Sequence, residues 1–310
     1  MTMAETIDEK YMRRCLQLAA YGRNESRPNP MVGAVIVADE RIIGEGYHVR
    51  CGEGHAEVNA FASVVAADEP LLHKATIYVS LEPCSHYGKT PPCADLIISK
   101  NVQRVVVGSV DPFASVQGRG IERIRAAGIE VTTGILEKEC QWQNRRFFTF
   151  HKKDRPYIIL KWAQTADDFM DDHGHAVAIS TPFTQMLVHK LRAEEDAIVV
   201  GRVTDEREHP QLTVRHWSGR NPVRFVLSHS FPIERLMKEC RSRQLQSLIV
   251  EGGRQTLLSF LDRGLYDEIR VEYGHISVGN GTPAPPLPQN LTLFSEEKYD
   301  GNIIRRYIKA

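Results

Sequence analysis

The feature that most constrains the fold of this chain is an alternation of apolar runs with amphipathic segments, broken once near residue 150. Strand-like runs at 75–81 and 102–110 alternate with helical patterns such as 55–68. Such alternation predicts a sheet covered by helices on both faces. A basic, aromatic-rich segment, CQWQNRRFFTFHKKDRP, then interrupts the pattern, and a second set of strands begins at 157.

The break predicts two domains, because 310 residues exceed the roughly 100 to 200 residues of one typical domain. We expect an N-terminal domain over 1–150 and a C-terminal domain over 151–310. In the second, strands are expected at 157–161, 197–201, 223–228, 247–250 and 268–273, and helices at 182–194 and 254–263. The biased segment GTPAPPLPQN is expected to be a loop.

Composition and charge argue against several classes of protein. Thirty-nine basic and 39 acidic residues give a net charge of zero, which disfavours a broad nucleic-acid or membrane-surface footprint. No apolar run approaches the ~20 residues that span a bilayer, so a soluble, cytoplasmic protein is expected. Six cysteines are too few for a disulfide scaffold, and clustered cysteines in a reducing cytoplasm indicate metal binding or catalysis.

Three interpretations are open for Cys84 and Cys93 in LEPCSHYGKTPPC: a disulfide, two unrelated thiols, or part of a metal site. His55 and Glu57 lie upstream, where a loop is expected to enter a helix. Cys84 follows a strand, and Cys93 is expected to open a helix, whose dipole favours the thiolate. One histidine and two thiolates suit a zinc ion with an open fourth position, as in a catalytic site.

Glu57 is expected to carry protons between metal-bound water and substrate, without being a ligand. Zinc deaminases have His-x-Glu followed by Pro-Cys-x-x-Cys, and the cysteine spacing here is longer. The chain order of His-Ala-Glu, a strand, Pro-Cys and a second cysteine at a helix start favours the metal site. Cys51 is not expected to be a zinc ligand, because three protein ligands and a water complete the coordination.

Several segments resemble the bifunctional deaminase/reductase family of riboflavin biosynthesis, the RibD family. In the first half these are RPNPMVGAVIV, GEGYHVRCGEGHAEVNA, YVSLEPCSHYGKTPPCADLII and DPFASVQGRGI. In the second they are YIILKWAQTADD, LRAEEDAIVVG, PQLTVR, NPVRFVL and LIVEGGRQTLLSFLDRGLYDEIRVE. The resemblance implies an α/β fold in two parts: a cytidine-deaminase-like αβα sandwich and a dihydrofolate-reductase-like α/β domain.

The resemblance also implies a function in two steps. A zinc-dependent hydrolytic deamination would act on a diaminopyrimidinone carrying a ribosylamino 5'-phosphate, and NADPH would then reduce the ribosyl group to ribityl. The partner would be this small molecule, with no nucleic acid or membrane, and the protein would be a homo-oligomer, a dimer or a tetramer. Implied substrate contacts in the deaminase half are Asn29, His48, His86 and Lys89.

In the second half, the resemblance implies substrate contacts from Arg192, Leu212, Arg215 and Glu251. It implies cofactor contacts from Thr204, Glu208, Gly252 and Gly253. The glycine pair follows a predicted strand and precedes a predicted helix, where free N–H groups could hold a phosphate. A plain turn is the alternative.

Some positions depart from the family pattern. Phe113-Ala114 stand where Asn-Pro is usual, and Asp168 replaces the glycine of Ser-x-Asp-Gly. Ala176 and Ala178 replace a serine and a tryptophan, and the short segment 229–246 predicts a shortened reductase domain.

Two further functions therefore stay open. One is a deaminase alone, with a structural or oligomerisation module as its second domain. The other is a non-enzymatic protein whose N-terminal domain is stabilised by a structural zinc ion. Glu57 argues against the last, because structural zinc sites fill all four positions with protein ligands.

Overall fold

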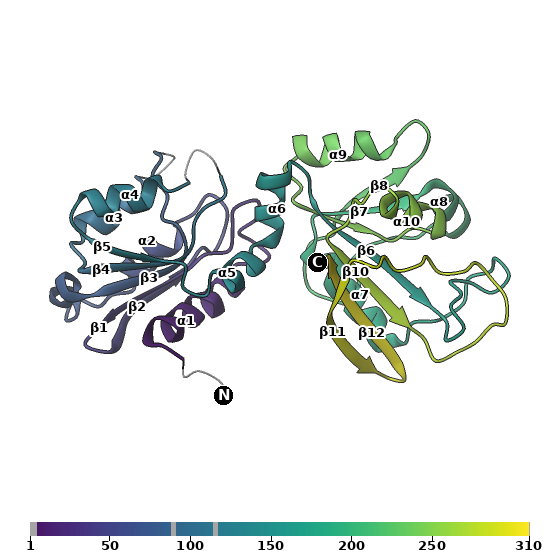
Figure 1. The fold of residues 1–310 in the computed structure, drawn as a ribbon, viewed down its shortest axis with the longest axis horizontal. Coiled ribbons are helices and arrows are strands. Elements are labelled where there is room, and N and C mark those ends of the chain that lie inside the picture. Colours follow the sequence, from purple (N-terminus) through teal and green to yellow (C-terminus); the bar gives the residue numbers. More distant parts are fainter. Residues whose placement is uncertain (1–4, 88–90, 114–116, 310) are drawn as a thin grey trace. The chain divides into compact units, whose positions relative to one another are not determined.

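The computed structural model describes residues 5–87, 91–113 and 117–309, which fall into two compact units, Met1–Lys153 and Asp154–Ala310. Each unit contains one sheet with helices packed against it (Figure 1). The mixed α/β prediction is confirmed for both units. Among the described residues, no helix is both long enough and apolar enough to cross a membrane.

The sheet of the N-terminal unit has the strand order β2-β1-β3-β4-β5. Its strands are β1 (Gly33–Ala38), β2 (Arg41–Tyr47), β3 (Thr76–Leu81), β4 (Arg104–Ser109) and β5 (Glu130–Thr133). A hairpin joins β1 to β2 through Asp39 and Glu40, which both have positive φ, as a two-residue turn of this kind requires. From β3 to β5 the strands run parallel, so their carboxyl ends share one edge.

Helices cover both faces of this sheet, because residues along each strand alternate between two cores. Ile36 and Ile77 pack with α2 (Ala56–Ala62), α3 (Cys93–Ser99) and α4 (Arg119–Ala126). Val35 and Tyr78 pack on the other side with α1 (Ile7–Tyr21) and α5 (Glu137–Gln143). A 3-10 turn, η1 (Glu69–Lys74), precedes β3, and α6 (Arg145–Lys153) ends the unit.

The C-terminal unit has a seven-stranded sheet with the order β11-β12-β10-β6-β9-β7-β8. Its strands are β6 (Tyr157–Gln164), β7 (Ala197–Gly201), β8 (Val223–Leu227), β9 (Ser247–Val250), β10 (Glu268–Tyr273), β11 (Leu291–Tyr299) and β12 (Asn302–Lys309). The five expected strands are confirmed, with β6 three residues longer and β8 one residue shorter than predicted. The sequence reading missed the antiparallel pair β11–β12 after the proline-rich segment.

Four helices accompany this sheet: α7 (Pro182–Glu194), α8 (Arg202–Glu208), α9 (Ile233–Ser242) and α10 (Arg254–Leu261). The sequence predicted α7 and α10, and it missed α8 and α9. Helix α9 lies within the short segment 229–246 and connects the parallel strands β8 and β9, whose common neighbour is β7. The short segment therefore still contains a complete crossover.

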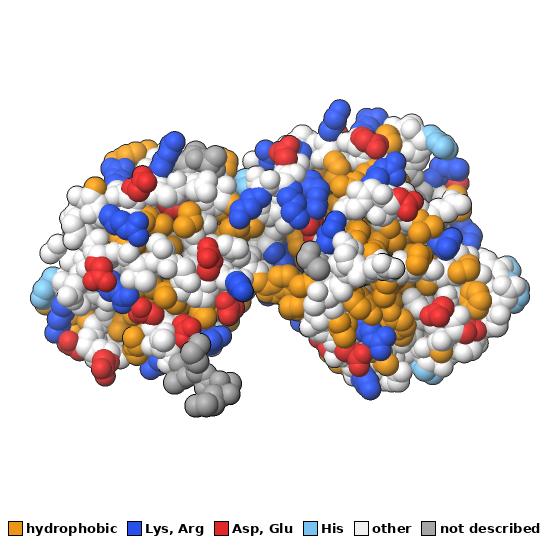
Figure 2. Space-filling view, in the orientation of Figure 1, with side chains coloured by type: hydrophobic (Ala, Val, Ile, Leu, Met, Phe, Trp, Pro, Cys, Tyr) orange, Lys and Arg blue, Asp and Glu red, His pale blue; other side chains and the backbone are white. Residues whose placement is uncertain are grey.

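Basic and acidic side chains are interspersed on the visible face of the N-terminal unit (Figure 2). One partly buried cluster of such charges fixes α1 to the sheet. Asp8 accepts hydrogen bonds from the Tyr78 hydroxyl at 2.9 Å and from the Arg104 guanidinium at 2.8 and 3.0 Å. The Arg104 hydrogen bond lowers the pKa of Asp8 below its usual 3.8, although burial opposes this.

We expect Asp8→Asn to reduce the free energy of unfolding by about 1 to 2 kcal/mol at neutral pH, since charge-assisted hydrogen bonds are lost. Because the folded pKa lies below the unfolded one, this contribution is present above the unfolded pKa and disappears as pH falls through the folded pKa. Urea unfolding of both proteins across acidic pH measures it. A stability difference that stays constant into strong acid would contradict the assignment.

Candidate functional site

The structure brings His55, Cys84 and Cys93 together, although they come from three separate segments of the chain. His55 precedes the first residue of α2, Cys84 follows β3, and Cys93 is the first residue of α3. Their candidate ligand atoms all lie within 4.8 Å of one another. The Nδ1 atom of His55 lies 3.6 Å from Sγ of Cys84 and 3.3 Å from Sγ of Cys93.

These separations fit a tetrahedral zinc ion. Zinc–nitrogen bonds of about 2.0 Å and zinc–sulfur bonds of about 2.3 Å put the two ligand atoms about 3.5 Å apart across a tetrahedral edge. The observed distances of 3.3 and 3.6 Å lie on either side of that value. One imidazole nitrogen and two thiol sulfurs are also a donor set that zinc prefers.

The two thiols interact strongly with each other. The interaction between the two thiols lowers the pKa of Cys84 below its usual value and raises the pKa of Cys93. Sγ of Cys84 also accepts the backbone N–H of Cys93 at 3.3 Å. The contact with Cys84 raises the pKa of His55, while burial acts against it. The surroundings thus favour a thiolate at Cys84, the form that binds metal.

Glu57 lies in the first turn of α2, next to these ligands, with 2% of its surface exposed. Burial raises the pKa of its carboxyl group. Its Oε2 atom is buried without a hydrogen-bond partner among the described residues. Because an unpaired buried oxygen is costly, this atom is suited to contact a ligand or a proton donor.

Asn29 and His48 form a hydrogen-bonded pair beside the metal ligands. Nδ1 of His48 lies 3.1 Å from the carbonyl oxygen of Gly54, so this nitrogen carries the proton. Burial lowers the pKa of His48, which favours the neutral ring, and Nε2 then accepts from Nδ2 of Asn29 at 3.1 Å. The His48 ring meets the edge of His55 at 5.4 Å between centroids. This arrangement leaves Oδ1 of Asn29 as an acceptor for a ligand.

Two predicted substrate contacts, His86 and Lys89, belong to the sequence between the two cysteines. His86 is exposed, and Lys89 lies outside the described residues. Asp111 is buried near this segment, and burial raises its pKa to about 6, while the N–H of Phe113 donates to it at 2.8 Å. Phe113 stands where the family pattern has asparagine, and its ring packs against His151 at 5.2 Å.

The sequence reading missed two residues that support this site. The amide side chain of Asn144 accepts from the N–H of Met31 and donates to its carbonyl oxygen, both at 2.8 Å, and so fixes the segment that carries Asn29. Glu82 is a buried carboxylate next to Pro83-Cys84. An acidic residue directly after a largely buried strand was the available signal for Glu82; Asn144 had none.

In the C-terminal unit, the predicted residues Arg192 and Glu251 form a bidentate ion pair, with distances of 3.0 and 2.7 Å. Both side chains are largely buried. Lys161 lies nearby, and burial lowers its pKa even though the Glu251 charge opposes this. The charges of Arg270 and Glu272 also act on Lys161, so three basic and two acidic side chains leave an excess of positive charge, which suits an anionic ligand.

Arg215 and Leu212 lie on the segment after α8. The backbone N–H of Arg215 donates to Nδ1 of buried His189 at 3.0 Å, and its guanidinium donates to Gln211 at 2.5 Å. The carbonyl oxygen of Thr213 accepts from Arg192 at 3.4 Å, which places this segment beside the ion pair. Leu212 is buried with positive φ.

Three of the four predicted cofactor residues cluster at the start of α10. A Cβ atom on Gly253 would lie 3.3 Å from the Thr204 hydroxyl, and one on Gly252 would lie 2.5 Å from the side chain of Thr256. The close approach explains why glycine is needed at 252, whereas a side chain at 253 would only require a small shift of the Thr204 hydroxyl. Glu208 instead lies exposed at the end of α8 and pairs with Arg207 at 2.7 Å.

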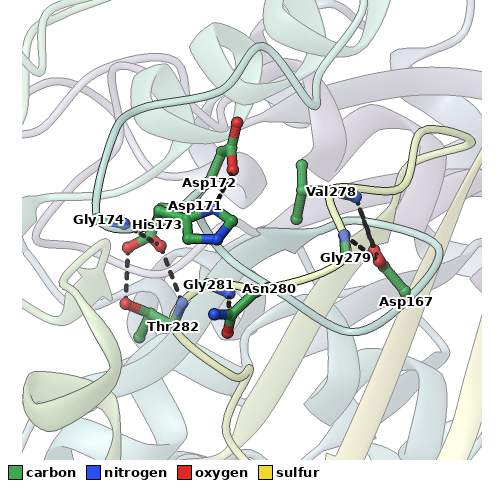
Figure 3. Close-up of polar contacts among 10 residues, drawn as sticks. All are labelled: Asp167, Asp171, Asp172, His173, Gly174, Val278, Gly279, Asn280, Gly281 and Thr282. Atoms are coloured by element: carbon green, nitrogen blue, oxygen red, sulfur yellow. Dashed lines mark hydrogen bonds and ion pairs between the residues drawn. The ribbon is translucent and has the colours of Figure 1, made fainter.

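The segment after β6 contains three of the departures from the family pattern, Asp168, Ala176 and Ala178. Asp168 has φ of +67°, a conformation that favours glycine, and it accepts from Gln164 at 2.6 Å. Figure 3 shows how neighbouring carboxylates attach this segment to residues 278–282. Asp167 accepts the N–H groups of Val278 and Gly279, and Asp171 accepts from Gly174 and Thr282. These contacts hold the segment in place.

Comparisons with known proteins agree with both units. The family model "Cytidine and deoxycytidylate deaminase zinc-binding region" matches residues 5–109, and "RibD C-terminal domain" matches residues 156–303. Riboflavin biosynthesis protein RibD of Aquifex aeolicus is 36% identical, with 90% of each chain covered. RibD of Synechocystis is 42% identical over 73% of this chain and 61% of its own length.

Solved structures match the whole chain. A deaminase/reductase from Thermotoga maritima, described as acting on diaminohydroxyphosphoribosylaminopyrimidine and 5-amino-6-(5-phosphoribosylamino)uracil, has a TM-score of 0.88. It is 32% identical, and the match covers 98% of this chain and 99% of that one. RibD of Acinetobacter baumannii is 28% identical, with a TM-score of 0.86 and 98% and 99% coverage.

Fold and site therefore define a zinc-dependent deaminase joined to an NADPH-using reductase domain. The chain belongs to the RibD family, and it is an enzyme of riboflavin biosynthesis.

We expect Cys93→Ala to lose bound zinc, because it removes one of three ligands. Cys51→Ala is the matched control: this thiol is exposed and outside the cluster, so zinc should be retained. The measurement is the zinc-to-protein ratio by mass spectrometry after dialysis. Equal zinc contents in the two variants would show that the ion binds elsewhere.

Proposed function

We propose that this chain deaminates a diaminopyrimidinone carrying a ribosylamino 5'-phosphate and then reduces the product's ribosyl group to ribityl with NADPH. The observation that supports this most directly is the His55, Cys84 and Cys93 cluster with the buried Glu57 carboxylate beside it, whose Oε2 atom has no hydrogen-bond partner among the described residues. A structural zinc site would use a fourth protein ligand, and none is found among the described residues.

In the first step the ring amino group is replaced by oxygen and leaves as ammonia. His55, Cys84 and Cys93 would hold a zinc ion, which would supply a Lewis acid that makes water more acidic near the ring. Glu57 would take up a proton from the attacking water and deliver protons to the ring nitrogen and to the leaving amino group. Asn29, oriented by neutral His48, accepts a hydrogen bond from the pyrimidine, and His86 and Lys89 bind its phosphate.

In the second step the C-terminal domain binds and orients the reactants, and NADPH supplies the hydride. Arg192, Arg215, Leu212 and Glu251 hold the substrate. The support for this is the buried charge cluster that Arg192 and Glu251 form with Lys161. Gly252, Gly253 and Thr204 approach the cofactor at the start of α10, and Glu208 contacts it from α8.

We also propose that the enzyme is cytoplasmic, where a reducing environment keeps its six free cysteines reduced. We further propose that it is a homo-oligomer, a dimer or a tetramer. The boundary between its two domains in the sequence is proposed to lie near residue 150.

Glu57→Gln is expected to keep zinc but to slow ammonia release by about 10²- to 10⁴-fold, since the amide cannot carry the proton. Glu53→Gln is the matched control. Glu53 is exposed and lies two residues before His55 in the sequence, whereas Glu57 lies two residues after it. Its turnover should stay at the wild-type level. Zinc content and ammonia release are measured on all three proteins. Rapid turnover by Glu57→Gln would refute the role of Glu57.

A coupled assay tests the reductase half. With the diaminopyrimidine ribosylamino phosphate and NADPH, wild-type protein should oxidise one NADPH for each ammonia released. Glu251→Gln should release ammonia at the wild-type rate but oxidise NADPH more slowly, because the ion pair with Arg192 is weakened. Ammonia without NADPH oxidation in the wild type would instead identify the C-terminal domain as a structural module. If zinc-loaded protein neither releases ammonia nor oxidises NADPH, that result would support a non-enzymatic role.

A further inference from the structure

Glu82 is a buried carboxylate, 4% exposed, between the end of β3 and the start of α4. Its Oε2 atom accepts the backbone N–H groups of Asp111 at 3.2 Å and Gly118 at 2.9 Å. Its Oε1 atom accepts those of Gly120 at 3.0 Å and Ile121 at 3.4 Å. Four N–H dipoles directed at one carboxylate stabilise its charge in a buried position.

The same residue is close in sequence to a zinc ligand, because only Pro83 separates Glu82 from Cys84. The backbone N–H of Glu82 donates to the carbonyl oxygen of Ser109 at 2.9 Å. Gly120 packs so closely on Pro83 that a Cβ atom would lie 1.9 Å from the Pro83 carbonyl oxygen. The segment that delivers Cys84 is therefore fixed to the segment that begins α4.

The segment held by Glu82 also reaches the deaminase site. Asp111 lies near enough to His86 and Cys84 for their charges to act on its carboxyl group. Asp111 in turn accepts the N–H of Phe113, whose ring contacts His151 of α6. A displacement at Glu82 would thus move groups next to the zinc ligand Cys84 and next to the predicted substrate contact His86.

We propose that Glu82 is a positioning residue for the deamination: it holds residues 111–113 and 117–121 against the zinc-ligand segment and so sets how the substrate meets Glu57. The inference rests on the proposed deaminase function. It differs from a purely structural role because it predicts a loss of turnover larger than the loss of stability explains.

The test is Glu82→Gln in the full-length, zinc-loaded protein. Glutamine has the same size but replaces one acceptor oxygen with an NH₂ group, so part of the set of N–H groups loses its acceptor. We expect unchanged zinc content and a fall in kcat/KM for ammonia release of about 10- to 100-fold, as misplacement of reacting groups causes. Amide hydrogen exchange at Gly118, Gly120 and Ile121 should accelerate.

Asp8→Asn is the matched control, since Asp8 also accepts several hydrogen bonds, but from Tyr78 and Arg104 on the α1 side of the sheet. It should lower stability and leave kcat/KM unchanged. Wild-type kcat/KM in Glu82→Gln would overturn the inference, and so would a loss of turnover that follows a loss of zinc.

If Glu82→Gln gives no folded protein, Glu82→Asp provides the test, because it keeps the charge but withdraws the oxygens from the N–H groups. An intermediate kcat/KM supports the positioning role, and wild-type kcat/KM refutes it. Wild-type protein that releases no ammonia would refute the proposed function itself, which distinguishes that failure from a failure of the inference.

Discussion

The N-terminal domain depends on one constraint: a nitrogen and two sulfurs from three segments must lie about 3.5 to 3.8 Å apart across the edges of a tetrahedron. The fold meets it by ending β3 just before Cys84 and by starting α2 and α3 beside that strand end. Glu82 extends the constraint from the metal ligands to the segment before α4. The groups around the ligands are therefore fixed before a substrate arrives, which is what electrostatic catalysis requires.

The C-terminal domain follows a different principle, because hydride transfer needs orientation more than acid–base groups. Its charges, from Arg192, Glu251 and Lys161, are buried together, and its glycine pair lets the backbone approach α10 closely. The departure from the family pattern at Asp168 is accommodated by contacts of its own segment. Asp168 occupies a conformation suited to glycine, but a hydrogen bond from Gln164 and the contacts of Asp167 and Asp171 hold its segment.

Much of this architecture could be predicted from local patterns. Strands such as β7 and β9 are short, continuous apolar runs, whereas β11 exposes most of its residues and gives no such signal. Helix α9 did carry a signal, since Ile233, Leu236 and Cys240 recur at helical spacing and are buried. The metal ligands were predictable because residue type and chain order carry the chemistry. The pairing of Arg192 with Glu251 and the four contacts of Glu82 were not, since they join residues far apart in sequence.

The central claim is that His55, Cys84 and Cys93 hold zinc with one position open to solvent, next to Glu57. X-ray absorption at the zinc edge on the purified protein tests it most directly, since it counts sulfur and lighter ligands separately. We expect two sulfurs, one imidazole nitrogen and one further light ligand that an added inhibitor anion or substrate replaces. A site with four protein ligands, or with a sulfur count other than two, would contradict it.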